Sequence, residues 1–293
     1  MPACHHDGVT LPAYPYPPPA PVQPKRRWWL VGIVATWIVV VAGLAVWSVR
    51  HDPPSVPEQR NIKQALPYLE RATGAMLAAA DVDGQAVVLG DLVFDRDCRV
   101  TPVRAGVQAV RDVIVHVRAG QVGAAFDAIA AGLPAAYHGR ARHSPQGTRH
   151  DLSADAGGFV AIDATARTDD TAFTLTASTG CRPLADGVDL SPADPPATNL
   201  PAAYQKAADA VGASAAAATE RQVSCPNGRT ASAVVSGDLP EPANLGKALE
   251  RLVPTTAVVQ ADPHDWAYRD GDVSIVVSGV DGKVQVAATA GCG

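Results

Sequence analysis

The chain has 293 residues, of which 47% are hydrophobic, 18% charged and 5% aromatic, and its formal net charge is −5 at pH 7. This acidic balance argues against a nucleic-acid-binding protein, because such proteins take most of their affinity from basic contacts with phosphates. The alanine-rich, lysine-poor composition is typical of bacteria with GC-rich genomes.

Residues 1–27 are predicted to form a disordered, proline-rich tail. Prolines recur from Pro2 to Pro24, and such a segment buries too little apolar surface to fold and favours polyproline II. The tail is either a solvated spacer or a docking segment for an aromatic groove. Its Cys4, His5, His6 and Asp7 form too short a cluster to predict a metal site.

Residues 28–49 are predicted to form a single transmembrane helix. No charged residue interrupts this segment. About 22 residues with a rise of ~1.5 Å each span ~33 Å, which is enough to cross a hydrocarbon core of ~30 Å. Trp28, Trp29 and Trp47 stand where aromatic belts lie at the two membrane interfaces. A cleaved signal peptide has a shorter apolar core that ends in small residues, so we expect an uncleaved anchor.

The flanks of this segment predict its orientation. Three basic residues at 25–27 adjoin its N-terminal end, whereas the basic residues on the other side are spread over about 15 positions. The tight cluster favours a cytoplasmic N-terminus, and hence a plasma-membrane protein with an extracytoplasmic C-terminal domain. Residues 50–60 contain three prolines and are predicted to form a stiff stalk.

The remainder is predicted to be α+β, with two tandem, repeat-related modules at 61–183 and 201–293 joined by a linker at 184–200. Each module is expected to have the order helix, strand, strand, helix, strand, strand, with antiparallel sheets. The same landmarks recur in both halves. They are an Ala-rich helix (near 67–80 and 201–218), a cysteine, a short helix ending in proline (123–134 and 245–254), a His-Asp pair and a closing Gly-Cys.

The clearest local signal is a hairpin near the C-terminal end. Val273, Ile275 and Val277 alternate before Asp281-Gly282, and a second alternating run follows. Asp-Gly between alternating runs predicts a two-residue turn in which both turn residues have positive φ.

Four cysteines lie outside the tail, two in each predicted module, and none belongs to a Cys-x-x-Cys motif. The repeat selects one of the three possible pairings, Cys98 with Cys181 and Cys225 with Cys292. Disulfides persist in oxidising compartments, so this pairing supports the extracytoplasmic placement of the domain.

A basic segment after the second predicted helix of the first module supplies the candidate binding residues. They are His138, Arg140, Arg142, His143, Arg149, His150 and Asp151. Three histidines near a carboxylate could hold zinc, but the arginines would repel a cation, so we expect a solvated basic loop without a metal. The His-Asp pairs at 150–151 and 264–265 are predicted to be structural, because neighbours on a strand point to opposite faces.

The sequence therefore predicts a non-catalytic binding or assembly protein of a bacterial envelope, with no cofactor and no catalytic residue. Its expected partners are the lipid bilayer and an unidentified envelope protein, and nucleic acid is excluded. One alternative is an envelope hydrolase or carrier whose site lies in a cleft between the modules. The other is an accessory subunit of a membrane complex, in which Gly32 and Thr36 form a helix-packing face.

Overall fold

The computed structural model describes residues 28–51, 60–212 and 217–293. The predicted tail and most of the predicted stalk lie outside the described residues. The chain divides into two compact units, one up to Pro53 and one from Pro54 to Gly293. The second unit combines helices with antiparallel sheets, as predicted.

The described part of the first unit is the helix α1 (Trp28–His51), which runs two residues beyond the predicted end. Its stretch Trp28–Ser48 has a mean hydropathy of 2.4 and is long and apolar enough to cross a membrane. The Thr36 hydroxyl donates to the Gly32 carbonyl at 2.9 Å, so this polar group is satisfied within the helix.

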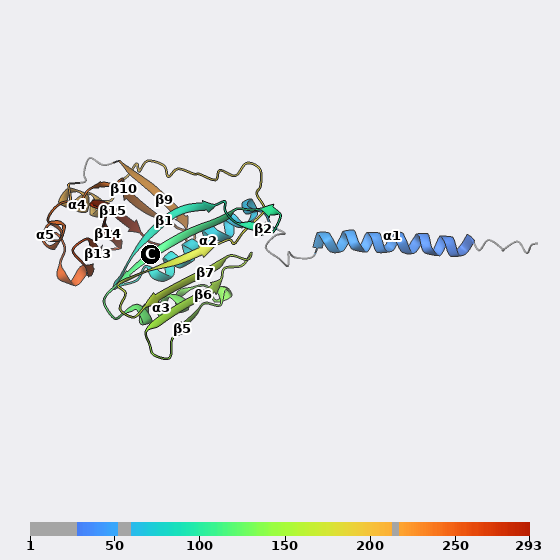
Figure 1. Ribbon diagram of the computed structural model, residues 1–293, viewed down its shortest axis with the longest axis horizontal. Coiled ribbons are helices and arrows are strands. Elements are labelled where there is room, and N and C mark those ends of the chain that lie inside the picture. Colours follow the sequence, from blue (N-terminus) through green and yellow to red (C-terminus); the bar gives the residue numbers. More distant parts are fainter. Residues whose placement is uncertain (1–27, 52–59, 213–216) are drawn as a thin grey trace, which may run out of the picture. The chain divides into compact units, whose positions relative to one another are not determined.

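The first half of the second unit is a six-stranded antiparallel sheet with helices on one face (Figure 1). Its helices are α2 (Ile62–Ala80), α3 (Val122–Gly132) and the short 3-10 helix η2 (Ala135–Tyr137). Its strands are β1 (Gln85–Asp95), β4 (Gln108–Val117), β5 (Arg140–His143), β6 (Arg149–Asp155), β7 (Ala161–Arg167) and β8 (Ala172–Ser178), in the order β1-β4-β8-β7-β6-β5. A separate small hairpin joins β2 (Arg99–Thr101) to β3 (Arg104–Ala105).

The second half forms another antiparallel sheet. Its helices are α4 (Ala202–Ala210), α5 (Leu245–Glu250) and the 3-10 helix η3 (Thr255–Ala257). Its strands are β9 (Ala218–Ser224), β10 (Thr230–Ser236), β11 (Leu239–Pro240), β12 (Val258–Ala261), β13 (Asp265–Asp270), β14 (Val273–Val280) and β15 (Lys283–Ala290). The order is β12-β13-β14-β15-β10-β9, with β11 beside β15. In each sheet an edge strand (β1 or β9) pairs with β4 or β10, which lies beside the last strand (β8 or β15), and the other strands follow from there in reverse chain order.

The structure corrects the predicted number of strands in each half. Four strands follow the second helix of each half, not two, because β5–β6 and β12–β13 are hairpins. Strand β5 (Arg140–His143) has the sequence Arg-Ala-Arg-His and so lacks the apolar alternation that identifies a strand. The segment expected to be a basic loop is therefore a β-hairpin.

Local sequence explains where several elements begin and end. Helix α2 starts earlier than predicted, because Asn61 and Gln64 form a reciprocal capping box at its N-terminus. Helix α4 ends at Ala210 and not near 218, and Gly212 follows with a φ of 76°. The predicted turn at Asp281-Gly282 has φ values of 52° and 73°, which confirms that both residues are left-handed.

The two halves share a hydrophobic cluster. In this cluster helix α2 packs over the first sheet, and Val223, Ala231 and Ala233 come from the second sheet. The second half also has a separate cluster of its own, which includes side chains of α4 and α5. On the opposite face of β1, Ala86 and Val88 pack with residues of the second sheet. Figure 1 shows β1 lying between the two groups of strands. Residues 54–293 therefore form one compact unit.

A largely buried arginine fastens the segment between the halves. Arg221 on β9 pairs with Asp91 at the irregular middle of β1 and with Asp194, at 2.8 Å from Nε. It also donates to the Leu89 carbonyl at 3.1 Å. Burial raises the pKa of Asp91, the charge of Arg221 opposes this effect, and a hydrogen bond that protonated Asp91 donates to Asp194 adds to it. The segment predicted to be a linker is therefore fixed to β9 by the ion pair between Asp194 and Arg221.

Candidate functional site

The structure divides the predicted binding residues between the two faces of the β5–β6 hairpin. Register pairs Arg142 with Asp151 and His143 with His150, and side chains alternate along each strand. His150 is buried, with 6% of its surface exposed, whereas Asp151 faces the other side. As predicted, His150 and Asp151 do not meet.

The outer face of the hairpin carries an arginine cluster around one carboxylate. Arg149 donates to Asp151 through Nε at 3.1 Å and Nη2 at 2.9 Å, and the Thr165 hydroxyl donates to the same oxygen at 2.8 Å. These hydrogen bonds, Thr165 first and Arg149 second, lower the pKa of Asp151. The charge of Arg142 acts in the same direction. Asp151 therefore stays ionised and offsets part of the positive charge.

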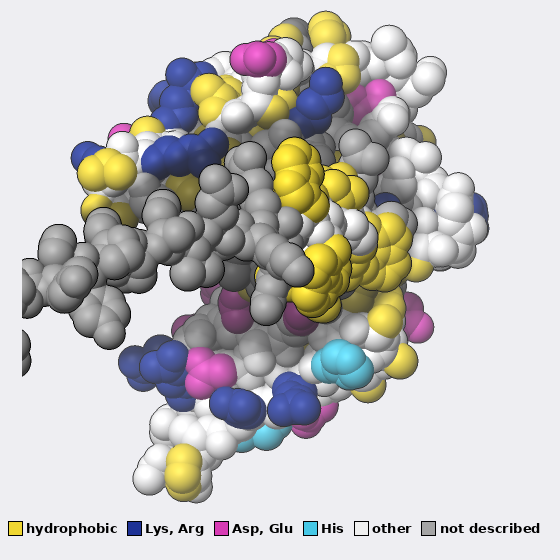
Figure 2. Space-filling model, turned by 90° about the vertical axis from the view of Figure 1, so that its right-hand side faces the viewer, with side chains coloured by type: hydrophobic (Ala, Val, Ile, Leu, Met, Phe, Trp, Pro, Cys, Tyr) yellow, Lys and Arg dark blue, Asp and Glu magenta, His cyan; other side chains and the backbone are white. Residues whose placement is uncertain are grey.

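Arg140 and Arg142 are two further exposed cations of this outer face. Neither side chain makes a hydrogen bond or ion pair with any residue that the structure describes. In Figure 2 the lower part of the molecule, where Figure 1 places β5 and β6, shows Lys and Arg side chains close to histidine. This arrangement can attract an anionic group of a partner.

The inner face of the hairpin carries a chain of hydrogen bonds that sequence analysis missed. His143 Nε2 lies 3.1 Å from Asp127 Oδ1 on α3, and His143 Nδ1 lies 2.6 Å from His150 Nδ1. His150 Nε2 lies 2.9 Å from the Thr168 hydroxyl, which in turn donates to the Gly147 carbonyl. We call these five residues the histidine chain.

The strand register alone would have indicated two members of the histidine chain. Once β5 and β6 are paired as a hairpin, His143 and His150 fall opposite each other on one face. Asp127 comes from a helix and Thr168 follows β7, so no local pattern connects either to the histidines. His138, the seventh candidate, stands apart as the C-cap of η2, with a φ of 51°.

Two other histidines have separate partners. His264 Nδ1 lies 2.6 Å from Glu241 Oε1, and this hydrogen bond, with the charge of Glu241, raises the pKa of His264. His116 is buried on β4 and bonds to Gln260 of β12 at 2.7 Å. Burial lowers the pKa of His116, so it is held neutral between the two halves.

Cavities lie along the junction of the two halves. One of about 380 Å³ is lined from both, by Asp83, Gly84 and Arg118 and by Ala257, Val259, Arg269 and Gly271. It shares lining residues with cavities of about 600 Å³ beside α3 and about 490 Å³ beside α4. None of the seven candidate residues lines these cavities, and no histidine is among their described linings.

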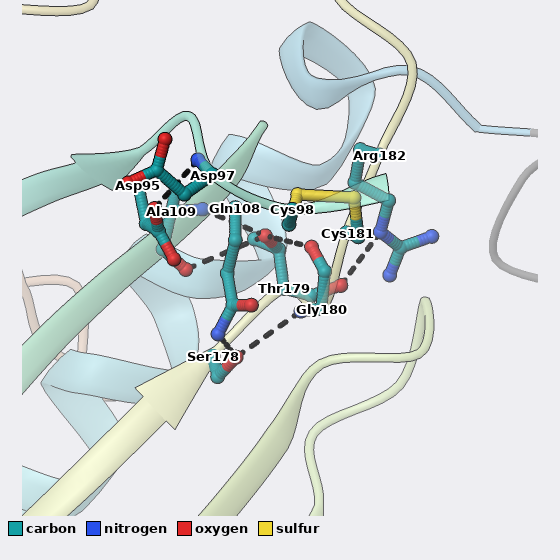
Figure 3. The surroundings of a disulfide bond; sticks show 10 residues. All are labelled: Asp95, Asp97, Cys98, Gln108, Ala109, Ser178, Thr179, Gly180, Cys181 and Arg182. Carbon is teal, nitrogen blue, oxygen red and sulfur yellow. Dashed lines mark hydrogen bonds between the residues drawn. A yellow bond between two sulfur atoms is a disulfide. The ribbon is translucent and has the colours of Figure 1, made fainter. Parts of the chain in front are cut away.

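The four cysteines lie in the two pairs that the sequence order predicts. Cys98 and Cys181 have Cα atoms 5.8 Å apart, and Cys225 and Cys292 have Cα atoms 5.7 Å apart. Figure 3 shows the first pair beside Thr179 and Arg182, where the Thr179 hydroxyl accepts from the Ala109 amide at 3.0 Å. Among the described residues, no three His, Cys, Asp or Glu side chains are close enough to hold a metal ion.

Comparisons with known proteins give little further information. No family model matches the chain, and no curated protein matches it. A crystal structure of a DUF4853 family protein from Actinomyces odontolyticus ATCC 17982 is 14% identical, with a TM-score of 0.32 over 63% of this chain and 98% of that chain. The structure of MucB in complex with MucA(peri) is 11% identical, with a TM-score of 0.12 over 75% of this chain and 92% of that chain. Likenesses this weak carry no argument about function.

Proposed function

We propose that this is a single-pass membrane protein of a bacterial envelope, with a cytoplasmic N-terminus and an extracytoplasmic, non-catalytic binding domain. One combination of features carries the proposal. The chain joins an apolar helix of membrane-spanning length to a domain with two cysteine pairs at disulfide distance. Disulfides are typical of oxidising compartments, and the basic residues at 25–27 favour the cytoplasmic side for that end.

The outer face of the β5–β6 hairpin is the proposed binding surface. Strand β5 lies at the end of its sheet, so one side of its backbone has no neighbouring strand in the sheet. Arg140 and Arg142 are exposed beside this edge. An extended acidic segment of another envelope protein could add as a further strand, with alternate carboxylates facing the arginines. The lipid bilayer, around α1, is the second proposed partner.

The alternative of an envelope hydrolase or carrier has less support. It requires histidine and carboxylate groups that converge in a cavity between the halves. The described linings of the junction cavities contain arginines and carboxylates without a histidine. Binding without catalysis fits this lining better.

We further propose that the two halves descend from one duplicated unit. The matching strand orders of the two sheets and the matching cysteine positions support this origin. A duplicated unit would explain why the β5–β6 hairpin has a counterpart in β12–β13. Strand β12 has no arginine and the single arginine of β13, Arg269, is paired with Asp81, so only the first hairpin would have acquired the binding surface.

Cysteine labelling on intact cells tests the proposed topology. A membrane-impermeant maleimide should label Cys98, Cys181, Cys225 and Cys292 only after reduction, because oxidised cysteines do not react. Cys4 in the tail is the internal control, since it should react only after lysis and without a reductant.

Two outcomes would contradict the proposed topology. Labelling of Cys4 on intact cells would reverse the orientation. Labelling of the other four cysteines without a reductant would show that the disulfides do not form in the cell.

A further inference from the structure

The histidine chain links five separate parts of the fold. Asp127 belongs to α3, His143 to β5 and His150 to β6, while Thr168 and Gly147 come from two different turns. Its two imidazoles meet through their Nδ1 atoms at 2.6 Å, with the rings inclined at 72° to each other. His150 is buried against Phe126, with ring centroids 6.0 Å apart. Water therefore has little access to the His150 ring, whereas the His143 side chain is 37% exposed.

A count of hydrogens shows what this geometry requires. An ionised carboxylate only accepts, so His143 Nε2 must carry a hydrogen to bond Asp127. The Thr168 hydroxyl gives its hydrogen to the Gly147 carbonyl, so His150 Nε2 must also carry one. If both rings were neutral, two unprotonated Nδ1 lone pairs would face each other at 2.6 Å. One more hydrogen between them removes this repulsion and completes the chain.

We propose that His143 and His150 form a binding site for one extra proton, which is held between their Nδ1 atoms and fastens the β5–β6 hairpin to α3. The proton comes from solvent, and no bond other than an N–H bond forms or breaks. A second extra proton is excluded, because two N–H groups would then point at each other. The site does not depend on which partner the hairpin binds.

The surrounding charges allow one positive charge at this site. Asp127 of α3 is the carboxylate that contacts the pair, and its own side chain is 65% exposed. Of the other charged groups nearby, Arg142, Arg149, Asp151 and Arg167 lie on the outer face of β5, β6 and β7. In the turn after β7, Asp169 and Asp170 accept hydrogen bonds from Arg167, so neither is bound to the histidines.

The hydrogens on the two rings determine whether the β5–β6 hairpin is more stable at low or at high pH. Without the extra proton, Thr168 must turn its hydroxyl towards His150, and the Gly147 carbonyl loses its donor. The fastened hairpin therefore binds the proton better than the released hairpin does. This stabilisation is present at acidic pH, where the proton is bound, and is lost as the pH rises and the proton leaves.

Hydrogen exchange on the full-length protein in detergent micelles tests the proposal. Exchange rates of the β5 and β6 amides, corrected for intrinsic pH dependence, are compared at pH 5.5 and pH 8, with the β14–β15 hairpin as an internal reference. We expect the relative protection to be about tenfold greater at pH 5.5, because one charge-assisted hydrogen bond is gained.

Two substitutions that should leave the fold intact test the proton site. His143→Gln removes the shared proton at a partly exposed ring, and Asp127→Asn removes only the contacting charge, so both should reduce the pH effect. His138→Gln is the matched control, because it changes a histidine outside the chain. Burial lowers the pKa of His116, so this residue destabilises the fold as the pH falls, which is opposite to the effect of the histidine pair. His116 is present in every variant and therefore does not change the comparison between them.

The proposal would be overturned by any of three results. The first is an unchanged pH effect in His143→Gln, and the second is protection in the wild type that increases with pH. The third is stoichiometric binding of Zn²⁺, measured by calorimetry with zinc chloride, that His143→Gln abolishes. This third result would make the two Nδ1 atoms metal ligands and not holders of a proton.

Discussion

Arg182 shows how a single charged side chain can be structural and not functional. It is the largest fully buried side chain of the described residues. Its Nε donates to the Thr179 carbonyl at 2.6 Å, and Nη2 donates to the carbonyls of Gly158 and Phe159 at 3.0 and 2.8 Å. These bonds join the end of β8 to the turn between β6 and β7, beside the Cys98–Cys181 pair of Figure 3. Such charged hydrogen bonds offset the desolvation of the guanidinium.

We expect Arg182→Met to lower the free energy of unfolding by about 3 kcal/mol or more, because buried carbonyls lose their donors. Urea denaturation measures the change. Arg167→Met is the matched control, since its ion pair with Asp169 is more than 70% exposed on both sides, and should shift stability by no more than about 0.5 kcal/mol. Equal effects of the two substitutions would contradict a structural role for Arg182.

At the scale of elements, helix α2 approaches the second sheet at a glycine. A Cβ at Gly74 would overlap the backbone of Ser224 and lie 3.5 Å from the Cα of Cys225. Cys292 Sγ lies 3.7 Å from the Gly74 carbonyl, so the Cys225–Cys292 pair sits at the same contact. The close packing of α2 on β9 therefore depends on the missing side chain.

This contact reverses the usual effect of replacing a helical glycine. In an open helix Gly→Ala stabilises by about 1 kcal/mol. We expect Gly74→Ala to lower the free energy of unfolding by about 2 kcal/mol, because α2 and β9 must move apart to admit the methyl group. Thermal unfolding would measure this. Gly246→Ala in α5 is the control, since its Cβ would meet only Trp266 Nε1 at 3.8 Å; a loss there as large as at Gly74 would contradict the explanation.

The β5–β6 hairpin makes a second prediction at this scale. Reversing charge with Arg140→Glu and Arg142→Glu should reduce the capture of an acidic partner about tenfold, because like charges then face each other. The measurement is photo-crosslinking in intact envelope from a reactive residue at Gln146. Lys247→Glu, at an exposed position of α5, is the control, and its charge change equals that of each single arginine substitution. A partner recovered equally by both variants would place the binding surface elsewhere.

At the scale of the whole molecule, the second unit depends on contacts between its halves. Arg221 joins β9 to β1 and to the segment between the halves, and His116 bonds to Gln260 across the junction. The shared core includes side chains from both sheets. The second half also has a hydrophobic cluster of its own, but the shared clusters and the polar contacts join the two sheets, so we expect residues 60–293 to unfold as one cooperative unit.

The sequence by itself determined features that depend on neighbouring residues or on chain order. The length and apolarity of α1, the Asp281-Gly282 turn and the two cysteine pairings are of this kind. Each requires only a local period, a turn preference or a repeated order of landmarks.

Only the tertiary structure decided which candidate residues act together. The seven were expected in one basic loop, but strand register placed the arginines on one face and His143 with His150 on the other. Asp127 and Thr168 then joined the histidines from α3 and from the turn after β7. The physical reason is that a one-residue change of register exchanges the two faces of a strand. Partners from distant elements become visible only once that register is known.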